Sequence, residues 1–473
     1  MRLVILGGGP AGYAAAATAA HLGADVTLVE EGQLGGNCTM TDAIPSKTLL
    51  TTADAMLKIS QAEEEGVDFA RGFPEVNLRR TLARARAVAL HQSRGVRERM
   101  DGMNVQVLAG RGRVTGPNTL VTTVEGQQLE VPFDALLVCT GASPFVPPFV
   151  RPDARRVLTT RDVFEFRDLP EHLVVLGAGP TGCEFADFFS RCGSRVTLVS
   201  ARDQLLPSDD PDLAEVLEEV FLKRGMDVIK NGRATAAEID DPDAVRLILE
   251  DGRELDCSHL LLCIGMRPNT MDLGLDAAGV EFGDRGTLPI DEFCRTSVEH
   301  IYACGDVTGQ IMLANTAAMH GRTAAMHALG VDVDPIAYTG VAWCVFTRPE
   351  IAKAGISERQ ARVDGIPVQV TKHLIRANPR AVMENETDGI IKLLSDPDDG
   401  TVLGGAMVGL RASEVITTVA LAVHARLKVQ DLAETAAVNP SMSESLQRAA
   451  EKASEGLLGI SRVTLTSWRQ PRS

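Results

Sequence analysis

Residues 3–30 read LVILGGGPAGYAAAATAAHLGADVTLVE, and residues 173–200 read LVVLGAGPTGCEFADFFSRCGSRVTLVS. The two stretches align without a gap at one constant offset. Each consists of an apolar, β-branched run, a glycine-rich turn, an apolar stretch of helical length and a second apolar run that contains VTLV. The change from a period typical of strands to one typical of a helix and back predicts a strand–helix–strand unit. The sequence therefore predicts two copies of that unit.

Three glycines recur in each copy with the spacing G-x-G-x-x-G. The first permits a tight turn, the second lets the backbone approach a pyrophosphate, and the third lets the helix pack against the strand. The N-terminus of the helix then meets the phosphates with the positive end of its dipole. The residues are Gly7, Gly9 and Gly12 in the first copy and Gly177, Gly179 and Gly182 in the second. Two dinucleotide sites are therefore predicted.

The two copies differ at the end of the second strand. The first copy ends at Glu30, where a carboxylate can accept hydrogen bonds from a ribose 2′-hydroxyl. The second copy has Ser200 at that position, followed by Arg202. Because a carboxylate repels a 2′-phosphate and a guanidinium binds it, these residues favour NADPH over NADH at the second site. Arg202 could equally be a solvated turn residue.

The composition indicates a multidomain protein that does not bind nucleic acid. The chain has 473 residues, which is too long for one ordinary core, and its net charge of −16 is unfavourable for a phosphate backbone. The nine cysteines include no C-x-x-C pair, so no metal site is predicted, and they suit a reducing cytoplasm. No apolar run is long enough to cross a membrane. We therefore expect a cytoplasmic protein without a transmembrane segment.

Several further motifs, together with the two glycine-rich units, resemble the pyridine nucleotide–disulfide oxidoreductases, the group of lipoamide dehydrogenase and glutathione reductase. They are LLVCTGASP (136–144), LLCIGMRPN (261–269), IYACGDVTG (301–309), FTRPEIAKAG (346–355) and NPSMSES (439–445). The resemblance covers almost the whole chain. It implies an enzyme that uses FAD and NAD(P)H.

The resemblance also implies an α/β fold with two Rossmann-like dinucleotide-binding domains and a C-terminal α+β dimerisation domain. FAD would bind a domain made of residues 1–148 and 270–335. The NAD(P)-binding domain would comprise 149–269, and the dimerisation domain 336–473, so that the protein would be a homodimer.

The family motifs imply which residues hold the cofactors. Asp306 would bind the FAD ribitol, and a helix beginning in MLANTAAMHGR (312–322) would direct its dipole at flavin N1 and O2. The other positions assigned to cofactor binding from the resemblance are Pro10, Ala11, Gly36, Cys38, Gly112, Thr140, Gly141, Gly265, Leu313 and Ala314.

The family's redox segment, G-G-x-C-x-x-x-x-C-x-P-S-K, is only partly present. Gly35, Gly36 and Cys38 match, but the second cysteine is Ala43. The family's C-terminal H-P-x-x-x-E is also altered, because Asn439 replaces the histidine while Glu444 is kept. Asparagine forms hydrogen bonds but does not titrate. Both changes predict that dithiol exchange has been lost.

The remaining residues of the redox segment suggest that hydride transfer is retained. Lys47 would lie beside flavin N5 in the family, paired with Glu184, although an ordinary salt bridge is the alternative. Cys38 corresponds to the family's outer cysteine and is interpreted as a residual thiol. A sulfenic acid peroxidase would instead need its lone cysteine at the flavin-proximal position.

The sequence looks most similar to NAD(P)H quinone reductases of this family that lack the redox disulfide. In that interpretation reduced FAD passes two electrons to a quinone, and Asn439 and Glu444 of the neighbouring subunit line the acceptor pocket. Soluble pyridine nucleotide transhydrogenase is an alternative, since it also keeps only the first cysteine. A lipoamide dehydrogenase is disfavoured by Ala43, and a non-catalytic flavin-bearing subunit by the intact Lys47 and Glu184.

Overall fold

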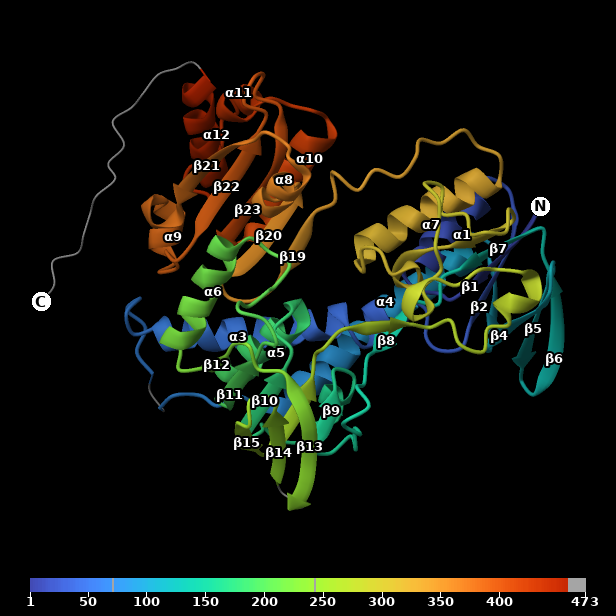
Figure 1. Cartoon of the computed structure of the whole chain (residues 1–473), viewed down its shortest axis with the longest axis horizontal. Coiled ribbons are helices and arrows are strands. Elements are labelled where there is room, and N and C mark those ends of the chain that lie inside the picture. The colour runs from blue at the N-terminus through green and yellow to red at the C-terminus, as the bar shows by residue number, and fades with distance from the viewer. Residues whose placement is uncertain (70–71, 242–243, 458–473) are drawn as a thin grey trace, which may run out of the picture. The chain divides into compact units, whose positions relative to one another are not determined.

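The computed structural model describes residues 1–69, 72–241 and 244–457. Contacts within the chain divide it into two compact units, which are described separately (Figure 1). The first unit contains residues 1–207 and 221–337, and the second contains residues 208–220 together with the chain from 338 onward. The sequence did not suggest that 208–220 groups with the C-terminal part. The division between an FAD and an NAD(P) domain stays a prediction.

The first parallel sheet is built around the first glycine-rich unit. Its strands are β1 (Arg2–Leu6), β2 (Asp25–Glu30), β3 (Gln106–Ala109), β7 (Ala135–Val138) and β18 (Ile301–Ala303). They lie in the order β18-β7-β1-β2-β3, all parallel. Four of the five residues of β1 are buried, as expected for a strand covered by helices on both faces.

Two helices pack closely on this sheet. They are α1 (Pro10–His21) and α7 (Ala314–Ala328), which lie side by side in Figure 1. The contact depends on Gly321, since a Cβ at that position would lie 2.1 Å from the Ala11 carbonyl oxygen. The alanine-rich sequence of α1 and this glycine allow the two backbones to approach each other.

Further helices and a small sheet are formed by the segments of chain that connect the strands of the first sheet. After β2 the chain forms α2 (Gly36–Met40), α3 (Ala43–Gln61) and α4 (Leu78–Gly102). A three-stranded antiparallel sheet follows, made of β4 (Gly112–Gly116), β5 (Thr119–Val124) and β6 (Gln127–Pro132). Short 3₁₀ helices flank β18, namely η2 (Leu275–Ala278), η3 (Asp284–Gly286) and η4 (Gly305–Thr308).

The second parallel sheet repeats the same arrangement around the second glycine-rich unit. Its strands are β9 (Val157–Thr159), β10 (His172–Leu176), β11 (Arg195–Val199), β12 (Asp227–Ile229) and β16 (His259–Leu262), in the order β12-β11-β10-β16-β9. In both sheets the first strand of the unit is central and lies beside the second. The predicted pair of strand–helix–strand units is confirmed.

Smaller elements complete the first unit. The helices are η1 (Asp162–Glu165) and α5 (Pro180–Arg191). An antiparallel sheet consists of β13 (Ala234–Asp241), β14 (Ala244–Leu249) and β15 (Glu254–Cys257), and a two-stranded ribbon of β8 (Ala142–Pro144) and β17 (Met266–Pro268).

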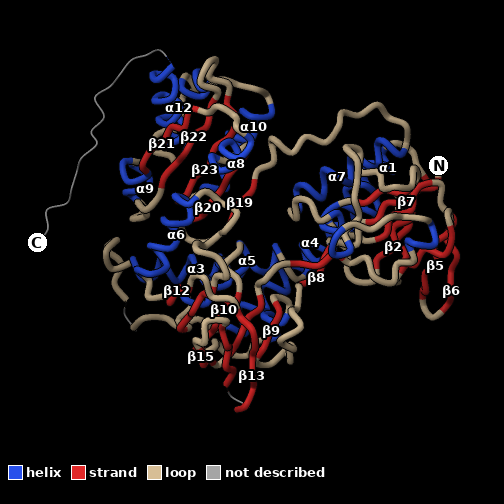
Figure 2. Tube along the Cα trace, in the orientation of Figure 1, coloured by secondary structure: helices blue, strands red, loops and turns tan. Residues whose placement is uncertain are grey.

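The second unit is an antiparallel sheet with helices, which Figure 2 shows as red strands surrounded by blue helices. The strands are β19 (Trp343–Val345), β20 (Glu350–Gly355), β21 (Gln369–Leu374), β22 (Ile390–Ser395) and β23 (Val402–Gly409). The helices are α6 (Pro211–Lys223), whose last turn belongs to the first unit, α8 (Glu358–Asp364), η5 (Ile375–Ala377), α9 (Pro379–Met383), α10 (Ala412–His424), α11 (Val429–Ala433) and α12 (Ser443–Leu457). This arrangement agrees with the predicted α+β class.

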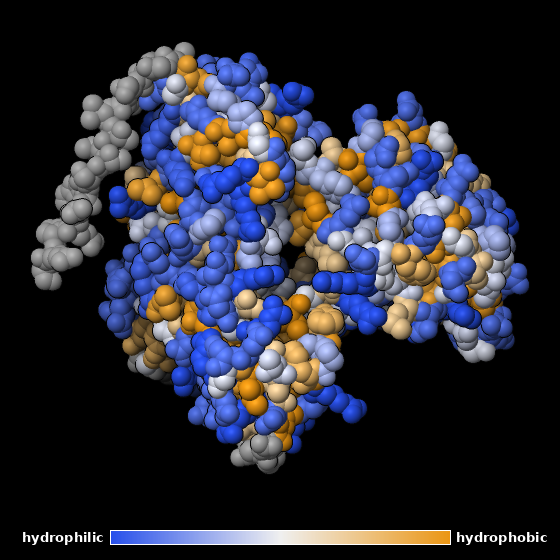
Figure 3. All heavy atoms as spheres, viewed as in Figure 1, coloured by the Kyte–Doolittle hydropathy of each residue, from blue (hydrophilic) through white to orange (hydrophobic). Residues whose placement is uncertain are grey.

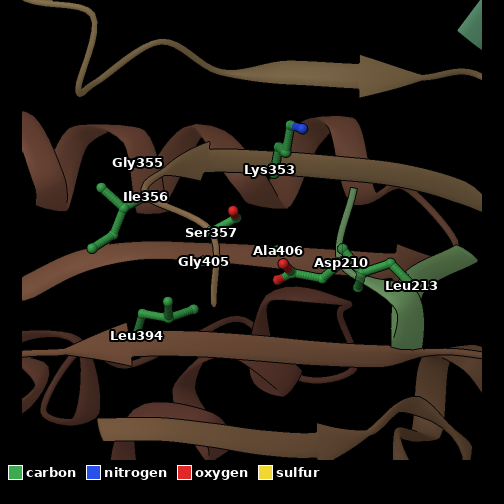
Figure 4. Close-up of a pocket in the computed structure, with 9 residues that line it drawn as sticks. All are labelled: Asp210, Leu213, Lys353, Gly355, Ile356, Ser357, Leu394, Gly405 and Ala406. Atoms are coloured by element: carbon green, nitrogen blue, oxygen red, sulfur yellow. The ribbon is translucent and has the colours of Figure 1, made fainter. Parts of the chain in front are cut away.

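A buried lysine joins residues 208–220 to the sheet of the second unit. The side chain of Lys392, on β22, is 0% exposed, and its Nζ lies 2.8 Å from a carboxylate oxygen of Asp210 and 2.8 Å from one of Asp212. A small hollow beside Asp210 is lined also by Lys353 and Ser357 (Figure 4). Its volume of about 10 Å³ is close to the minimum for one water molecule, so it is not a ligand site.

Replacing Lys392 by methionine is expected to destabilise the protein by about 3–5 kcal/mol, because it leaves the buried carboxylate of Asp210 without the Lys392 cation. The measurement is the shift of the urea unfolding midpoint. Lys372→Met is the matched control, since Lys372 also pairs with Asp212 but its side chain is 47% exposed, and its loss should cost less than about 1 kcal/mol. Equal shifts for the two variants would contradict this account.

Candidate active site

The first and third glycines of each glycine-rich unit are required by packing. A Cβ on Gly12 would lie 1.8 Å from the carbonyl oxygen of Gly7, and one on Gly182 would lie 1.8 Å from that of Gly177. Gly7 and Gly177 themselves have φ values of +106° and +111°, which side chains rarely adopt. The turn therefore brings each helix against its own strand.

Packing within the protein does not require the second glycine of each glycine-rich unit. Gly9 and Gly179 cap α1 and α5 with ordinary φ values of −72° and −76°. A Cβ on Gly179 would meet nothing within 4 Å, and one on Gly9 would meet only the Cα of Gly36, at 4.0 Å. The missing side chains leave open space over two helix N-termini, where Pro10 and Pro180 occupy the first turn. Such a space fits a pyrophosphate bound by backbone N–H groups.

Glu30 is held at the end of β2 beside the first turn. Its Oε2 accepts a hydrogen bond of 2.6 Å from the backbone N–H of Gly8, and its Oε1 accepts one of 2.7 Å from that of Gly32. The carboxylate is thus held in place beside the first turn, and its role in binding a ribose stays a prediction. Gly36 has a φ of +58° and lies against Gly9, since a Cβ there would be 2.7 Å from the Gly9 Cα.

At the corresponding position of the second glycine-rich unit, Ser200 is buried. Its hydroxyl donates to the carbonyl oxygen of Gln204 at 2.9 Å and accepts from the backbone N–H of Arg202 at 3.1 Å. The hydroxyl therefore closes a turn, a role that the sequence did not reveal. Arg202 is exposed, so it is the side chain of this pair that can reach a 2′-phosphate.

A rigid turn from Thr140 to Ser143 follows β7. Asn269, the residue after β17, holds it: its side-chain N–H donates to the Thr140 carbonyl oxygen at 2.9 Å, and its Oδ1 accepts from Ser143 at 2.7 Å. Gly141 and Gly265 have φ values of +68° and +108° and open surroundings. Gly112 differs, because it is buried and a Cβ there would meet Leu6 at 2.6 Å, so packing alone accounts for it.

The carboxyl groups of Asp306 and Asp42 both have raised pKa values. Burial, and then the negative charge of Asp42, raise the pKa of Asp306 to about 6. Burial also raises the pKa of Asp42, against the opposing effect of Arg161. The predicted helix start after Asp306 is confirmed, since α7 begins at Ala314 with Leu313 as its N-cap.

Lys47 and Glu184 form the predicted ion pair. Lys47, on α3, donates to Glu184, on α5, with a distance of 2.6 Å between Nζ and Oε2, and the glutamate side chain is only 5% exposed. Such a pair is costly to desolvate, so its geometry has to be well supported.

A second, parallel contact between the same helices supports it. About two turns further along both helices, Arg191 of α5 donates to Asp54 of α3 at 2.6 Å. Arg191 also binds Asp187 at 2.6 Å, and Asp187 is 0% exposed. Two ion pairs of opposite polarity thus fix the register of α3 and α5. No motif or spacing in the sequence indicated that Arg191 pairs with Asp54.

Comparison with known proteins identifies the family. The family model "Pyridine nucleotide-disulphide oxidoreductase" matches residues 1–321, and the dimerisation domain of the same family matches residues 341–450. The chain belongs to this family. Membership makes it an oxidoreductase, implies FAD and NAD(P)H as cofactors, and identifies residues 341–450 as a dimerisation domain.

Several relatives share nearly the whole chain. A Mycobacterium tuberculosis protein named NAD(P)H dehydrogenase (quinone) is 39% identical over 461 residues, covering 95% of this chain and 93% of its own. Dihydrolipoyl dehydrogenase of Bacillus subtilis is 33% identical and covers 95% and 98%. The crystal structure of LpdA from M. tuberculosis superposes with a TM-score of 0.90 at 39% identity, covering 96% and 99%. The HOCl-induced flavoprotein disulfide reductase RclA of Escherichia coli superposes with a TM-score of 0.84 at 28% identity, covering 95% and 99%.

This family member departs from the family's redox segment in chemistry as well as in sequence. All nine cysteines lie in the described ranges and are free thiols. Burial, and then the charges of Asp42 and Asp306, raise the pKa of Cys38 to about 11. Since the thiolate is the reactive form, Cys38 is a weak nucleophile at neutral pH.

Asn439 and Glu444 lie together in the dimerisation domain. The Asn439 amide donates to Glu444 Oε1 at 2.7 Å, and the backbone N–H of Ser441 donates to Glu444 Oε2 at 3.0 Å. The bonds from Ser441 and then Asn439 lower the pKa of Glu444. The glutamate thus stays ionised, with the Asn439 amide as its side-chain partner.

Outside these sites, the surface carries mostly hydrophilic side chains on the face shown in Figure 3, with apolar ones in small groups. Among the described residues, no helix combines the length and apolar character needed to cross a membrane.

The glycine geometry predicts that Gly179→Ala leaves the fold intact but impairs nucleotide binding. The new methyl group meets no protein atom, so the thermal unfolding midpoint should stay within about 2 °C, while the KM for NAD(P)H should rise at least tenfold. Gly182→Ala is the contrasting variant, because its methyl group would overlap the Gly177 carbonyl and should destabilise the protein. An unchanged KM in Gly179→Ala would contradict the assignment of this turn.

Proposed function

We propose that the protein is a homodimeric, FAD-dependent NAD(P)H:quinone oxidoreductase that works without a redox-active disulfide. The chemistry at position 43 carries this proposal. In place of the family's second cysteine stands Ala43, at the start of α3, and it has no redox chemistry. The remaining thiol, Cys38, is held protonated by its surroundings. Because no thiol relay exists, an acceptor has to meet the cofactor directly.

FAD, when bound, accepts a hydride from NAD(P)H and passes two electrons to an acceptor. The chain would hold it through the turn at Gly9, the carboxylates of Glu30 and Asp306, and the segment at Thr140. The turn at Gly179 would hold the nicotinamide dinucleotide. Lys47, oriented by Glu184, would bring a positive charge to the flavin and so favour charge transfer to it.

The acceptor side has lost the groups that serve thiols. Asn439 cannot accept a proton, so Glu444 has no basic partner of the kind that dithiol exchange requires. In a homodimer, Asn439 and Glu444 would line the acceptor pocket of the neighbouring subunit. A planar, partly apolar quinone suits a site where a cysteine has been replaced by a methyl group. The name of the M. tuberculosis relative, NAD(P)H dehydrogenase (quinone), supports the same acceptor class.

The experiment that tests this function measures NADPH oxidation with three acceptors side by side: 1,4-naphthoquinone, oxidised lipoamide and the thionicotinamide analogue of NAD⁺. Rapid turnover is expected with the quinone and none with lipoamide. Fast reduction of the nicotinamide analogue with slow quinone turnover would favour a transhydrogenase instead.

Cys38→Ser should keep quinone turnover within about twofold of the unaltered enzyme, because the Cys38 thiol is protonated at neutral pH. A large loss would show that the lone thiol takes part.

NADPH is the favoured reductant, and Arg202 is the residue that supports this preference. Its side chain is exposed three residues after the end of β11, two residues beyond Ser200, which corresponds to Glu30 of the first glycine-rich unit. Arg202→Ala should therefore raise the KM for NADPH about tenfold and leave the KM for NADH unchanged, because only NADPH carries the 2′-phosphate. Steady-state kinetics with both nucleotides make the comparison. Equal effects on the two would end the assignment.

A further inference from the structure

Arg161 is a charged residue near position 43 that the proposed chemistry has not used. It lies between β9 and η1 and reaches the rigid turn after β7. One terminal nitrogen of its guanidinium donates to the Ala142 carbonyl oxygen at 2.9 Å, and the other donates to Ser143 Oγ at 3.2 Å. Asn37 also donates to the Ala142 carbonyl oxygen, at 3.0 Å. The arginine is therefore fixed in position by a turn that is itself clamped by Asn269.

The third nitrogen of this guanidinium, Nε, has no hydrogen-bond partner among the described residues. Nε of Arg161 is buried, and the nearest carboxylate oxygen, Asp42 Oδ1, lies 3.9 Å away. That separation is too long for a hydrogen bond. An unsatisfied buried N–H is unfavourable unless a ligand or a small movement supplies an acceptor. The Nε–H is thus a donor held ready in a preformed arrangement.

The residues around this donor connect it to the altered redox segment. Asp42 immediately precedes Ala43, and Asn37 immediately precedes Cys38. Lys47, whose charge acts on Cys38, is bound to Glu184 at 2.6 Å. Arg161 makes no contact with a carboxylate at hydrogen-bond distance. It is therefore the cation of this group that can bind an incoming oxygen atom.

We propose that Arg161, fixed between the Ala142 turn and Asp42, is the binding residue for a carbonyl oxygen of the quinone acceptor, with the Nε–H as the donor. This inference rests on the proposed function, since it names a residue of the same acceptor site. A charged donor suits this ligand because a quinone oxygen gains negative charge when the ring is reduced. Asp42 keeps the guanidinium oriented from the side of Ala43. The sequence offered no signal for it, because Arg161 lies more than a hundred residues beyond the redox segment.

The test measures binding in the absence of a reductant. Calorimetric titration of the oxidised holoenzyme with 1,4-naphthoquinone gives a dissociation constant without turnover. Arg161→Met should raise this constant at least tenfold, the loss expected for one hydrogen bond from a charged donor. Arg86→Met is the matched control. Arg86 also anchors η1, through the Phe164 carbonyl and Glu165, and its partners do not include Asp42, so the constant should change less than twofold.

Kinetics on the same variants separate this inference from the proposed function. In Arg161→Met the KM for quinone should rise in parallel with the dissociation constant, whereas the rate of single-turnover reduction by NADPH should stay the same. Quinone turnover with an unchanged KM in Arg161→Met would leave the function standing and overturn the role of Arg161. If the unaltered enzyme binds quinone through Arg161 but does not turn it over, the role of Arg161 stands and the proposed function is overturned.

Flavin content and the thermal unfolding midpoint show whether Arg161→Met folds. If it does not, Arg161→Lys replaces it, because lysine keeps the charge but lacks the Nε–H and the planar fork. A tenfold weaker binding of quinone in Arg161→Lys supports the proposal. Binding as tight as in the unaltered enzyme overturns it.

Discussion

The rest of the structure depends on one constraint in each glycine-rich unit. Its third glycine lies in close contact with the carbonyl oxygen of its first glycine. A single methyl group at Gly12 or Gly182 would overlap that carbonyl, so only glycine lets the helix begin directly above the end of its strand. The helix N-terminus then lies at the carboxyl edge of a parallel sheet, beside an open space. Because this geometry occurs twice, the chain can offer two similar sites to two different dinucleotides.

The ion pairs between α3 and α5 provide a physical link between the parts of the chain that carry the two glycine-rich turns. Lys47 and Asp54 come from a helix that follows the first glycine-rich unit, whereas Glu184 and Arg191 come from the helix of the second. One contact would leave α5 free to pivot about it. Two contacts about two turns apart, both largely buried, hold the register of the helices and with it the orientation of the Lys47 ammonium.

Under the proposed function, the family framework is kept while its thiol chemistry is lost. Ala43 removes the second sulfur, burial keeps Cys38 protonated, and Asn439 removes the titrating partner of Glu444. What is left near Ala43 is a set of hydrogen-bonding groups, namely Asn37, Asp42 and Arg161. Such groups bind and orient an acceptor but do not exchange electrons with it. This is the chemistry expected of a site for a carbonyl-containing acceptor.

The sequence by itself determined the two strand–helix–strand units, the α/β class and the family, because glycine spacing, apolar periodicity and the order of motifs act over short distances along the chain. It also located Lys47, Glu184 and Ala43, since each lies inside or next to a recognisable motif. Only the tertiary structure decided that Ser200 closes a turn, that Arg191 pairs with Asp54, and that Arg161 reaches the segment before Ala43. These contacts join residues whose separation along the chain carries no periodic signal, and they depend on how whole helices and turns pack. The same holds for Lys392, whose burial against Asp210 follows from the packing of residues 208–220 on a distant sheet.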